Sequence, residues 1–168
     1  IYILRNPLDL VLSIMNHFSM TLDEAIEKMA NIGGGTPITK SHVPEIHSSW
    51  SNHVASWTSR PNPQLLIVRY EDLLEKPQIY FKKVTQFLGL TPPQDRLDRA
   101  IRFSSFKVLK EQEEHGGFVE RPRKVDAFFR EGRKDQWREK LTPEQVRRII
   151  NAHREQMQRF RYIPKDYA

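Results

Sequence analysis

The sequence predicts a three-layer α/β fold in which helices flank a parallel central sheet. Two uninterrupted apolar runs, at 1–4 and 65–68, have the composition of strands that are buried on both faces. Amphipathic helical patterns lie between and after these runs, and this alternation is typical of a parallel sheet. A length of 168 residues suffices for one domain with a hydrophobic core, and we find no internal repeat or domain boundary.

The first predicted strand already includes residue 1. A parallel strand that opens a chain has no sheet neighbour before it in the sequence. We therefore expect residues 1–168 to form a single partial domain whose amino-terminal part is missing from this sequence.

The first helix is predicted to follow this strand directly. Asn6 is a favourable N-cap residue, and Pro7 is favourable at the first helical position. Arg5 then lies at the carboxyl end of a strand, where open α/β sheets bind ligands, so Arg5 and Ser13 are candidates to face one pocket. The alternative is that Arg5 pairs with Asp9 and that Ser13 is an ordinary helical serine.

The next elements are a short helix and a glycine run. Thr21 and Glu24 form a capping-box pattern that begins a helix ending at about Asn31. The glycines at 33–35 follow a helix and lack the Gly-Lys-Ser/Thr ending of a phosphate loop, so we interpret them as a flexible loop beside a substrate pocket.

Apolar residues recur at helical spacing over 44–57, which predicts a helix with one buried face. The stripe comprises Ile46, Trp50, Val54 and Trp57, with His53 on the same side. The apolar run at 65–68 follows as a second buried parallel strand, and a turn is expected at 69–73.

Three further helices are predicted, beginning at Pro77, at about Thr91 and at Thr142. Their expected core residues are Phe81, Val84, Phe87 and Leu88, then Leu97 and Ile101, and finally Val146, Ile149, Ile150, His153 and Met157. Ser104–Lys107 is expected at the end of the second of these helices or in the next turn. No periodic pattern covers about 113–136, which predicts a functional or partly disordered stretch.

The net charge of +6 is unevenly distributed along the chain. Residues 1–84 carry eight basic and eight acidic side chains, whereas residues 85–168 carry nineteen and thirteen. A basic half attracts polyanions or nucleotides, with a solvated helical surface as the alternative. The absence of cysteine excludes disulfides and thiolate zinc sites, and no membrane-span or signal-peptide pattern is present, so we expect a cytoplasmic protein that does not bind membranes.

Four separated motifs occur in an order that resembles the cytosolic-type sulfotransferases, which use 3′-phosphoadenosine 5′-phosphosulfate. The motifs are Arg-x-Pro-x-Asp-x-x-x-Ser from Arg5, Tyr-Glu-Asp-Leu from Tyr70, Ser-Phe-Lys from Ser105, and Phe-Arg-x-Gly from Phe129 with a following Trp137. The resemblance extends from Ile1 to about Tyr162 and includes the helix with Trp50, His53, Val54 and Trp57. It implies a P-loop NTPase-like fold, and a reaction that requires no metal ion.

The resemblance also implies a role for particular residues. Arg5 and Ser13 would bind the 3′-phosphate of the cofactor, and Arg130 with the backbone of Gly132 would close over the same phosphate, because a guanidinium supplies a fork of donors. Tyr70 and Ser104 would contact the edge of the adenine, and Phe106 would stack on it.

Several of these residues have structural alternatives. Tyr70 and Phe106 could be core aromatics, and we interpret Trp50 and Trp57 as helix-packing residues. His17, beside Phe18, falls where the family lines its acceptor pocket, although a surface histidine is the alternative. The loops at 33–35 and 113–128 would line the remainder of that pocket.

The sequence also departs from the family pattern. Glu131 replaces a lysine, and Asp135-Gln136 replaces Gly-Asp before the tryptophan. A carboxylate near a phosphate is repulsive unless Glu131 turns outward or pairs with Arg133 or Lys134. The family's loop for the 5′-phosphosulfate and its upstream general-base histidine have no counterpart here, so we predict no catalytic residue and expect the chain to be inactive alone.

The resemblance predicts a sulfotransferase that moves a sulfuryl group from 3′-phosphoadenosine 5′-phosphosulfate to a hydroxyl or amine of a small molecule. Its nucleotide product would be adenosine 3′,5′-bisphosphate. The alternative is a non-catalytic basic module that binds nucleotides or RNA, but the glycine-aromatic signature of RNA binding is absent, so no nucleic-acid partner is expected. A degenerate, non-catalytic relic is a third possibility, suggested only by Glu131.

Overall fold

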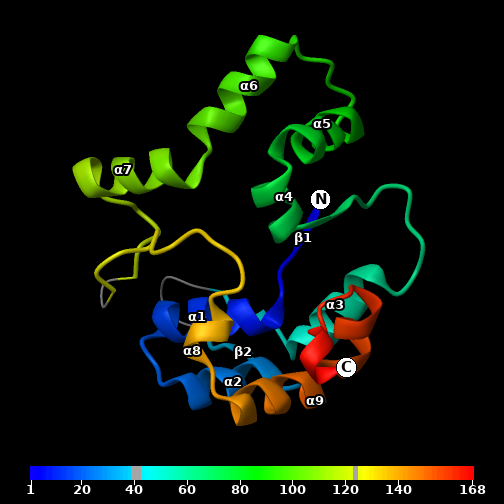
Figure 1. Cartoon of the computed structure of the whole chain (residues 1–168), viewed down its shortest axis with the longest axis vertical. Coiled ribbons are helices and arrows are strands. Elements are labelled where there is room, and N and C mark those ends of the chain that lie inside the picture. The colour runs from blue at the N-terminus through cyan, green and yellow to red at the C-terminus, as the bar shows by residue number, and fades with distance from the viewer. Residues whose placement is uncertain (39–42, 123–124) are drawn as a thin grey trace. The chain divides into compact units, whose positions relative to one another are not determined.

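The computed structural model describes residues 1–38, 43–122 and 125–168, which form two compact units (Figure 1). The first unit comprises residues 1–5 and 63–134, and the second comprises residues 6–62 and 135–168. Among the described residues, no helix is both long enough and apolar enough to cross a lipid bilayer.

The first unit is built on a parallel pair of strands. Strand β1 (Tyr2–Leu4) pairs with β4 (Ile67–Arg69), so that Tyr2 lies opposite Ile67 and Leu4 lies opposite Arg69. This pairing confirms the predicted parallel sheet. The helices that follow β4 are α4 (Tyr70–Glu75), α5 (Pro77–Phe87), α6 (Gln94–Phe103) and α7 (Phe106–Gly116). Helix α4 begins where a turn was predicted.

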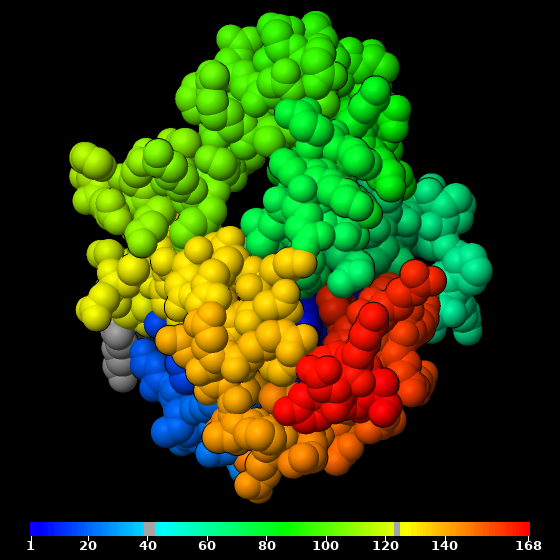
Figure 2. All heavy atoms as spheres, viewed as in Figure 1, coloured from blue at the N-terminus to red at the C-terminus, as the bar shows by residue number. Residues whose placement is uncertain are grey.

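Burial in the first unit is one-sided. Leu4 and Val68 are 1% and 2% exposed, whereas Ile3 and Ile67 are 59% and 37% exposed, so the expectation of strands buried on both faces is wrong for the described residues. Helix α5 likewise has no buried side chain, so its predicted apolar stripe is not part of a buried core. The space-filling view shows the green helices of this unit at its surface (Figure 2).

The second unit is mainly helical. Its elements are α1 (Pro7–Phe18), α2 (Leu22–Ala30), β2 (Gly35–Thr36), β3 (Glu45–Ile46), α3 (Trp50–Thr58), α8 (Trp137–Lys140), α9 (Pro143–Arg159) and the 3-10 helix η1 (Lys165–Tyr167). Strands β2 and β3 are antiparallel. The five predicted core residues of α9, which are Val146, Ile149, Ile150, His153 and Met157, are all buried.

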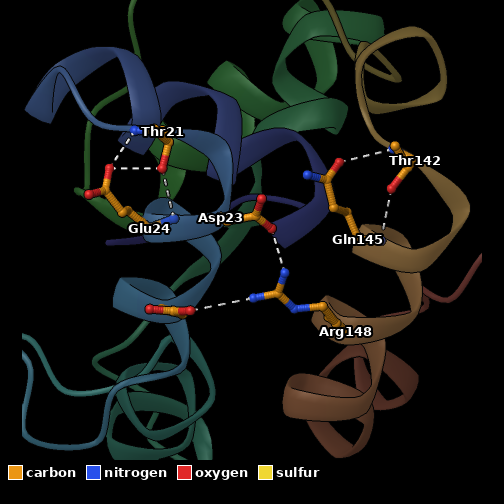
Figure 3. A network of polar contacts seen from close by, with 7 residues as sticks. Thr21, Asp23, Glu24, Thr142, Gln145 and Arg148 are labelled. Carbon is orange, nitrogen blue, oxygen red and sulfur yellow. Dashed lines mark hydrogen bonds and ion pairs between the residues drawn. The ribbon is translucent and has the colours of Figure 1, made fainter.

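Local capping bonds set the helix starts that the sequence predicts. The Asn6 side chain accepts a hydrogen bond from the backbone N–H of Leu8, and complete capping boxes begin α2 at Thr21 and α9 at Thr142. Figure 3 shows both boxes, and between them the Arg148 guanidinium of α9 binding the carboxylate of Asp23 on α2. These contacts help to hold α2 beside α9.

The predicted helix over 44–57 is partly wrong, because α3 begins only at Trp50. Ile46 instead pairs with Gly35 in the β2–β3 hairpin and is 89% exposed, and Trp57 is 55% exposed. The buried face of α3 is therefore formed by Trp50, Val54 and Thr58.

The predicted irregular stretch begins too early, because α7 continues through Glu113 to Gly116. The buried carboxylate of Glu113 accepts hydrogen bonds from the backbone N–H groups of Phe128 and Phe129, both at 2.8 Å. These long-range bonds give the helix partners that its sequence does not reveal. Residues 123–124 of the same stretch lie outside the described residues.

Candidate nucleotide-binding site

Arg5 and Tyr70 meet at one edge of the parallel sheet. Arg5 directly follows β1, and Tyr70 directly follows β4. Because the carboxyl ends of parallel neighbours lie at the same edge, the two side chains approach each other, and the guanidinium carbon of Arg5 lies 4.5 Å from the centroid of the Tyr70 ring. The aromatic face stabilises the cation and orients it. Both side chains are half-buried.

Arg130 brings a second guanidinium into the electrostatic range of Arg5. Burial lowers the pKa of Arg130, the charge of Glu131 raises it, and the charge of Arg5 lowers it. Arg130 nevertheless keeps its proton, because an arginine pKa starts far above neutrality. Two half-buried cations that repel each other form a site which a bound dianion would stabilise.

The carboxylate of Glu131 is paired with a neighbouring guanidinium. Its carboxylate forms an ion pair with the Arg133 guanidinium, with 2.8 Å between Oε2 and Nε. This contact is one of the two pairings that the sequence analysis considered. The other candidate partner, Lys134, forms an ion pair with Glu75 of α4. Pairing with Arg133 reduces the repulsion that Glu131 would exert on a phosphate held by Arg130.

Gly132 lies against the ring of Phe106. A Cβ atom at Gly132 would lie 2.1 Å from Cγ of Phe106, and the backbone of Gly132 has a φ of +60°. Both facts exclude a larger residue from this position. The structure therefore brings together the candidate adenine-stacking residue and the glycine whose backbone is a candidate phosphate donor.

The segment that carries Arg130 is held by α7. Lys110 donates a hydrogen bond to the carbonyl oxygen of Arg130 at 3.4 Å, and Glu113 binds the two preceding N–H groups as described above. Phe106, Lys110 and Glu113 follow the spacing i, i+4, i+7, which places them on one face of the helix. Sequence reasoning missed Lys110 and Glu113, although this spacing after Phe106 was a readable signal.

The predicted site residue Ser104 forms a hydrogen bond within its own helix. The hydroxyl of Ser104 donates to the carbonyl oxygen of Ala100 at 2.9 Å, which is a bond within the last turn of α6. Ser13 is half-buried in α1 and belongs to the second unit.

An open pocket of about 260 Å³ lies within the second unit, between α1, α2, the β2–β3 hairpin and α3. Gly34 and Gly35 line it, as expected for the glycine run, and Phe18 lines it where His17 was the candidate. His17 is exposed and packs edge-on against the Phe18 ring. The remaining apolar lining consists of Leu10, Ile14, Met29 and Trp50.

Trp50 has two roles in this unit. Its side chain is 8% exposed and contacts the buried His153 ring edge-on at a centroid distance of 5.4 Å, which agrees with its interpretation as a helix-packing residue. The same side chain also lines the pocket. The helix-packing interpretation of Trp57 is wrong, since most of its surface is exposed.

The family model and the curated relatives that match this chain are all sulfotransferases. Residues 1–161 match the family model described as the sulfotransferase domain, so the match spans both units. Sulfotransferase 2A6 of Rattus norvegicus is 28% identical over 165 residues, covering 95% of this chain and 57% of that protein. The 3-beta-hydroxysteroid sulfotransferase of Cavia porcellus is 27% identical over 163 residues, covering 94% of this chain and 55% of that protein.

Solved structures give the same result at the level of the fold. A crystal structure of mouse sulfotransferase SULT7A1 complexed with PAP has a TM-score of 0.71 and 24% identity, covering 93% of this chain and 56% of that chain. A retinol dehydratase in complex with androsterone and inactive cofactor PAP has a TM-score of 0.69 and 19% identity, covering 93% and 46%. The chain thus spans about half the length of the proteins that it matches.

Proposed function

The chain belongs to the sulfotransferase family, and from this premise we propose that its protein transfers a sulfuryl group from 3′-phosphoadenosine 5′-phosphosulfate to a small molecule. The α/β fold with a parallel sheet agrees with that of the structural neighbours. We further propose that both units belong to one partial sulfotransferase domain, which lacks the loop for the 5′-phosphosulfate.

The observation that carries this proposal is the pair of half-buried guanidiniums at the edge of the sheet. Arg130 lies within electrostatic range of Arg5, and the ring of Tyr70 orients the Arg5 guanidinium. This donor set fits the 3′-phosphate of the cofactor, because a phosphate dianion accepts the paired N–H groups of both guanidiniums. The backbone N–H of Gly132 is proposed to add a further donor.

The adenine end is proposed to lie on aromatic side chains. Phe106 has one ring face against Gly132 and meets Phe129 edge-on at 5.9 Å, so its orientation is fixed before a base binds. Stacking on such a ring contributes on the order of 1–3 kcal/mol per base. For Ser104 at the adenine edge and for Ser13 at the phosphate, the proposal rests on the sequence resemblance alone.

The bound cofactor supplies the sulfuryl group, and the residues of this chain hold its nucleotide end. We assign a catalytic role to none of them, because the general base and the 5′-phosphosulfate loop implied by the family have no counterpart in the matched motifs. We propose that the residues of this chain position the cofactor relative to the acceptor. Holding the two reacting groups in a fixed orientation lowers the entropic cost of the reaction between them.

We propose a small molecule bearing a hydroxyl or an amine as the acceptor. Two relatives are named as hydroxysteroid sulfotransferases, which act on hydroxyl groups attached to apolar ring systems. The apolar part of the pocket lining in the second unit suits the ring system of such an acceptor.

A calorimetric titration tests the nucleotide assignment. We expect adenosine 3′,5′-bisphosphate to bind the 168-residue chain at least tenfold more tightly than adenosine 5′-monophosphate, because only the former carries the 3′-phosphate that we propose the two arginines contact. Adenosine 3′-monophosphate should retain most of the affinity. Equal affinities for the 3′- and 5′-monophosphates would contradict the proposal, and preferential binding of polyuridylate would favour the RNA-binding alternative.

A further inference from the structure

The pocket of the second unit combines an apolar lining with basic groups. Its polar side chains are those of Lys28, His47, His53 and two serines, and none of the described residues that line it is an aspartate or glutamate. Covering the Lys28 ammonium group with a purely apolar ligand would carry a desolvation cost, which an anionic group on the ligand would offset.

Lys28 provides the strongest of these positive charges. It is half-buried on α2, and its ammonium nitrogen lies 4.4 Å from the centroid of the Phe18 ring, above the pocket's apolar lining. This cation–π contact directs the ammonium group toward the aromatic wall of the pocket.

The nearby carboxylates of α2 are engaged elsewhere. Asp23 forms an ion pair with Arg148, and Glu24 accepts the capping bonds of Thr21, as Figure 3 shows. Glu27 also forms an ion pair with Arg148. Within the described parts of the chain, no carboxylate forms an ion pair with Lys28. The pocket therefore holds a half-buried cation whose counter-ion the described protein does not supply.

The two histidines line the same pocket as Lys28 and supply ring nitrogens rather than a fixed positive charge. His47 forms an ion pair with Glu45 at 3.2 Å, and Glu45 does not line the pocket. Burial lowers the pKa of His53, and the charge of His47 lowers it further, so the two imidazoles lie within electrostatic range of each other.

From these contacts we propose that the pocket of the second unit binds acceptors that combine an apolar ring body with a carboxylate, and that Lys28 pairs with the carboxylate. This inference rests on the proposed function insofar as it describes the ligand as an acceptor. The apolar body of the acceptor would pack against Trp50, Leu10 and Met29. The ion pair with Lys28 would fix the orientation of the acceptor in the pocket.

Two probes of equal ring size test this inference, namely 6-hydroxy-2-naphthoate and 2-naphthol. We expect the carboxylate to bind the chain about tenfold more tightly than the neutral naphthol in calorimetric titrations without nucleotide, which is the factor expected for one charge-assisted hydrogen bond. The Lys28→Met variant keeps the apolar stem and should lose this preference while still binding 2-naphthol. The matched control, Lys140→Met, removes an exposed lysine at the end of α8 and should retain the preference.

Equal affinities of the wild-type chain for the two probes would overturn the inference, as would a preference that survives in Lys28→Met. The Lys28→Arg variant keeps the positive charge, so it should retain the preference for the carboxylate probe, and it provides a test even if Lys28→Met folds poorly. If Lys28→Arg lost this preference while still binding 2-naphthol, the proposed ion pair between residue 28 and the carboxylate would be wrong. A separate titration with adenosine 3′,5′-bisphosphate distinguishes the two proposals. Failure of nucleotide binding with a retained carboxylate preference would contradict the sulfotransferase proposal alone.

Discussion

Replacement of Arg130 by alanine is expected to weaken the binding of adenosine 3′,5′-bisphosphate about 100-fold, a loss typical of a bidentate contact between a guanidinium and a phosphate. The expectation follows from the half-burial of Arg130, which strengthens its interaction with an anion, and from its proximity to Arg5. Calorimetric titration of the variant and the wild-type chain measures the change.

Two further variants sharpen this prediction. Arg130→Lys keeps the charge but loses the planar fork of donors, so its affinity should lie between those of wild type and Arg130→Ala. Arg99→Ala removes an exposed arginine that pairs with Asp95 on α6, and it should bind the nucleotide as wild type does. An Arg130→Ala affinity within threefold of wild type would contradict the assignment of this side chain to the phosphate.

Replacement of Asp9 by alanine is expected to destabilise the chain by about 3 kcal/mol, because it leaves one buried and one half-buried N–H donor without this acceptor. The Asp9 side chain is 1% exposed in α1, and its carboxylate accepts hydrogen bonds from the backbone N–H groups of Asp135 at 2.7 Å and Trp137 at 3.0 Å. These bonds fix the start of α8 against α1 over a separation of 128 residues. Asp135 has a φ of +61°, which is an unfavourable conformation for a non-glycine residue and needs such support.

Urea denaturation followed by circular dichroism measures this loss. Asp23→Ala provides the control, because Asp23 is an exposed carboxylate in an ion pair with Arg148 and its loss should cost less than about 1 kcal/mol. If Asp9→Ala proved no more destabilising than Asp23→Ala, the role of Asp9 in holding α8 would be wrong.

The helix starts were predictable because their signals are local. Asn6, Thr21 and Thr142 each form the capping bonds that their sequence neighbours imply. The sequence analysis predicted two parallel strands but not that they are neighbours, so it did not predict the meeting of Arg5 with Tyr70. The structure pairs the two strands, and the residues that directly follow parallel neighbours share one edge of the sheet.

The predictions that were wrong depended on partners distant in the sequence. Helical spacing alone assigned Ile46 and Trp57 to a buried stripe, but Ile46 belongs to a hairpin strand and Trp57 faces solvent. The spacing of Glu113 on α7 did not reveal the backbone groups of Phe128 and Phe129 that satisfy its carboxylate. Periodicity identifies which residues share a face but not what covers that face.

In the candidate site, too, some features followed from the sequence and others are visible only in the structure. The family motifs gave Arg130, Gly132 and Phe106 as candidate site residues. The structure adds the close contact between Gly132 and Phe106, and the hydrogen bond from Lys110 of α7 to the carbonyl oxygen of Arg130. The sequence analysis gave the pairing of Glu131 with Arg133 as one of several alternatives, and the structure shows that this pair forms. Lys28 carried no signal in the sequence, because its significance comes from the aromatic ring below it and from carboxylates that pair elsewhere.

Phosphorus NMR of adenosine 3′,5′-bisphosphate tests most directly whether this chain holds the 3′-phosphate end of the nucleotide. On addition of the chain, we predict that the 3′-phosphorus resonance shifts and broadens far more than the 5′-phosphorus resonance, and that Arg130→Ala abolishes this difference. A spectrum in which the 5′-phosphorus responds more strongly, or in which neither resonance changes at saturating protein, would contradict the account.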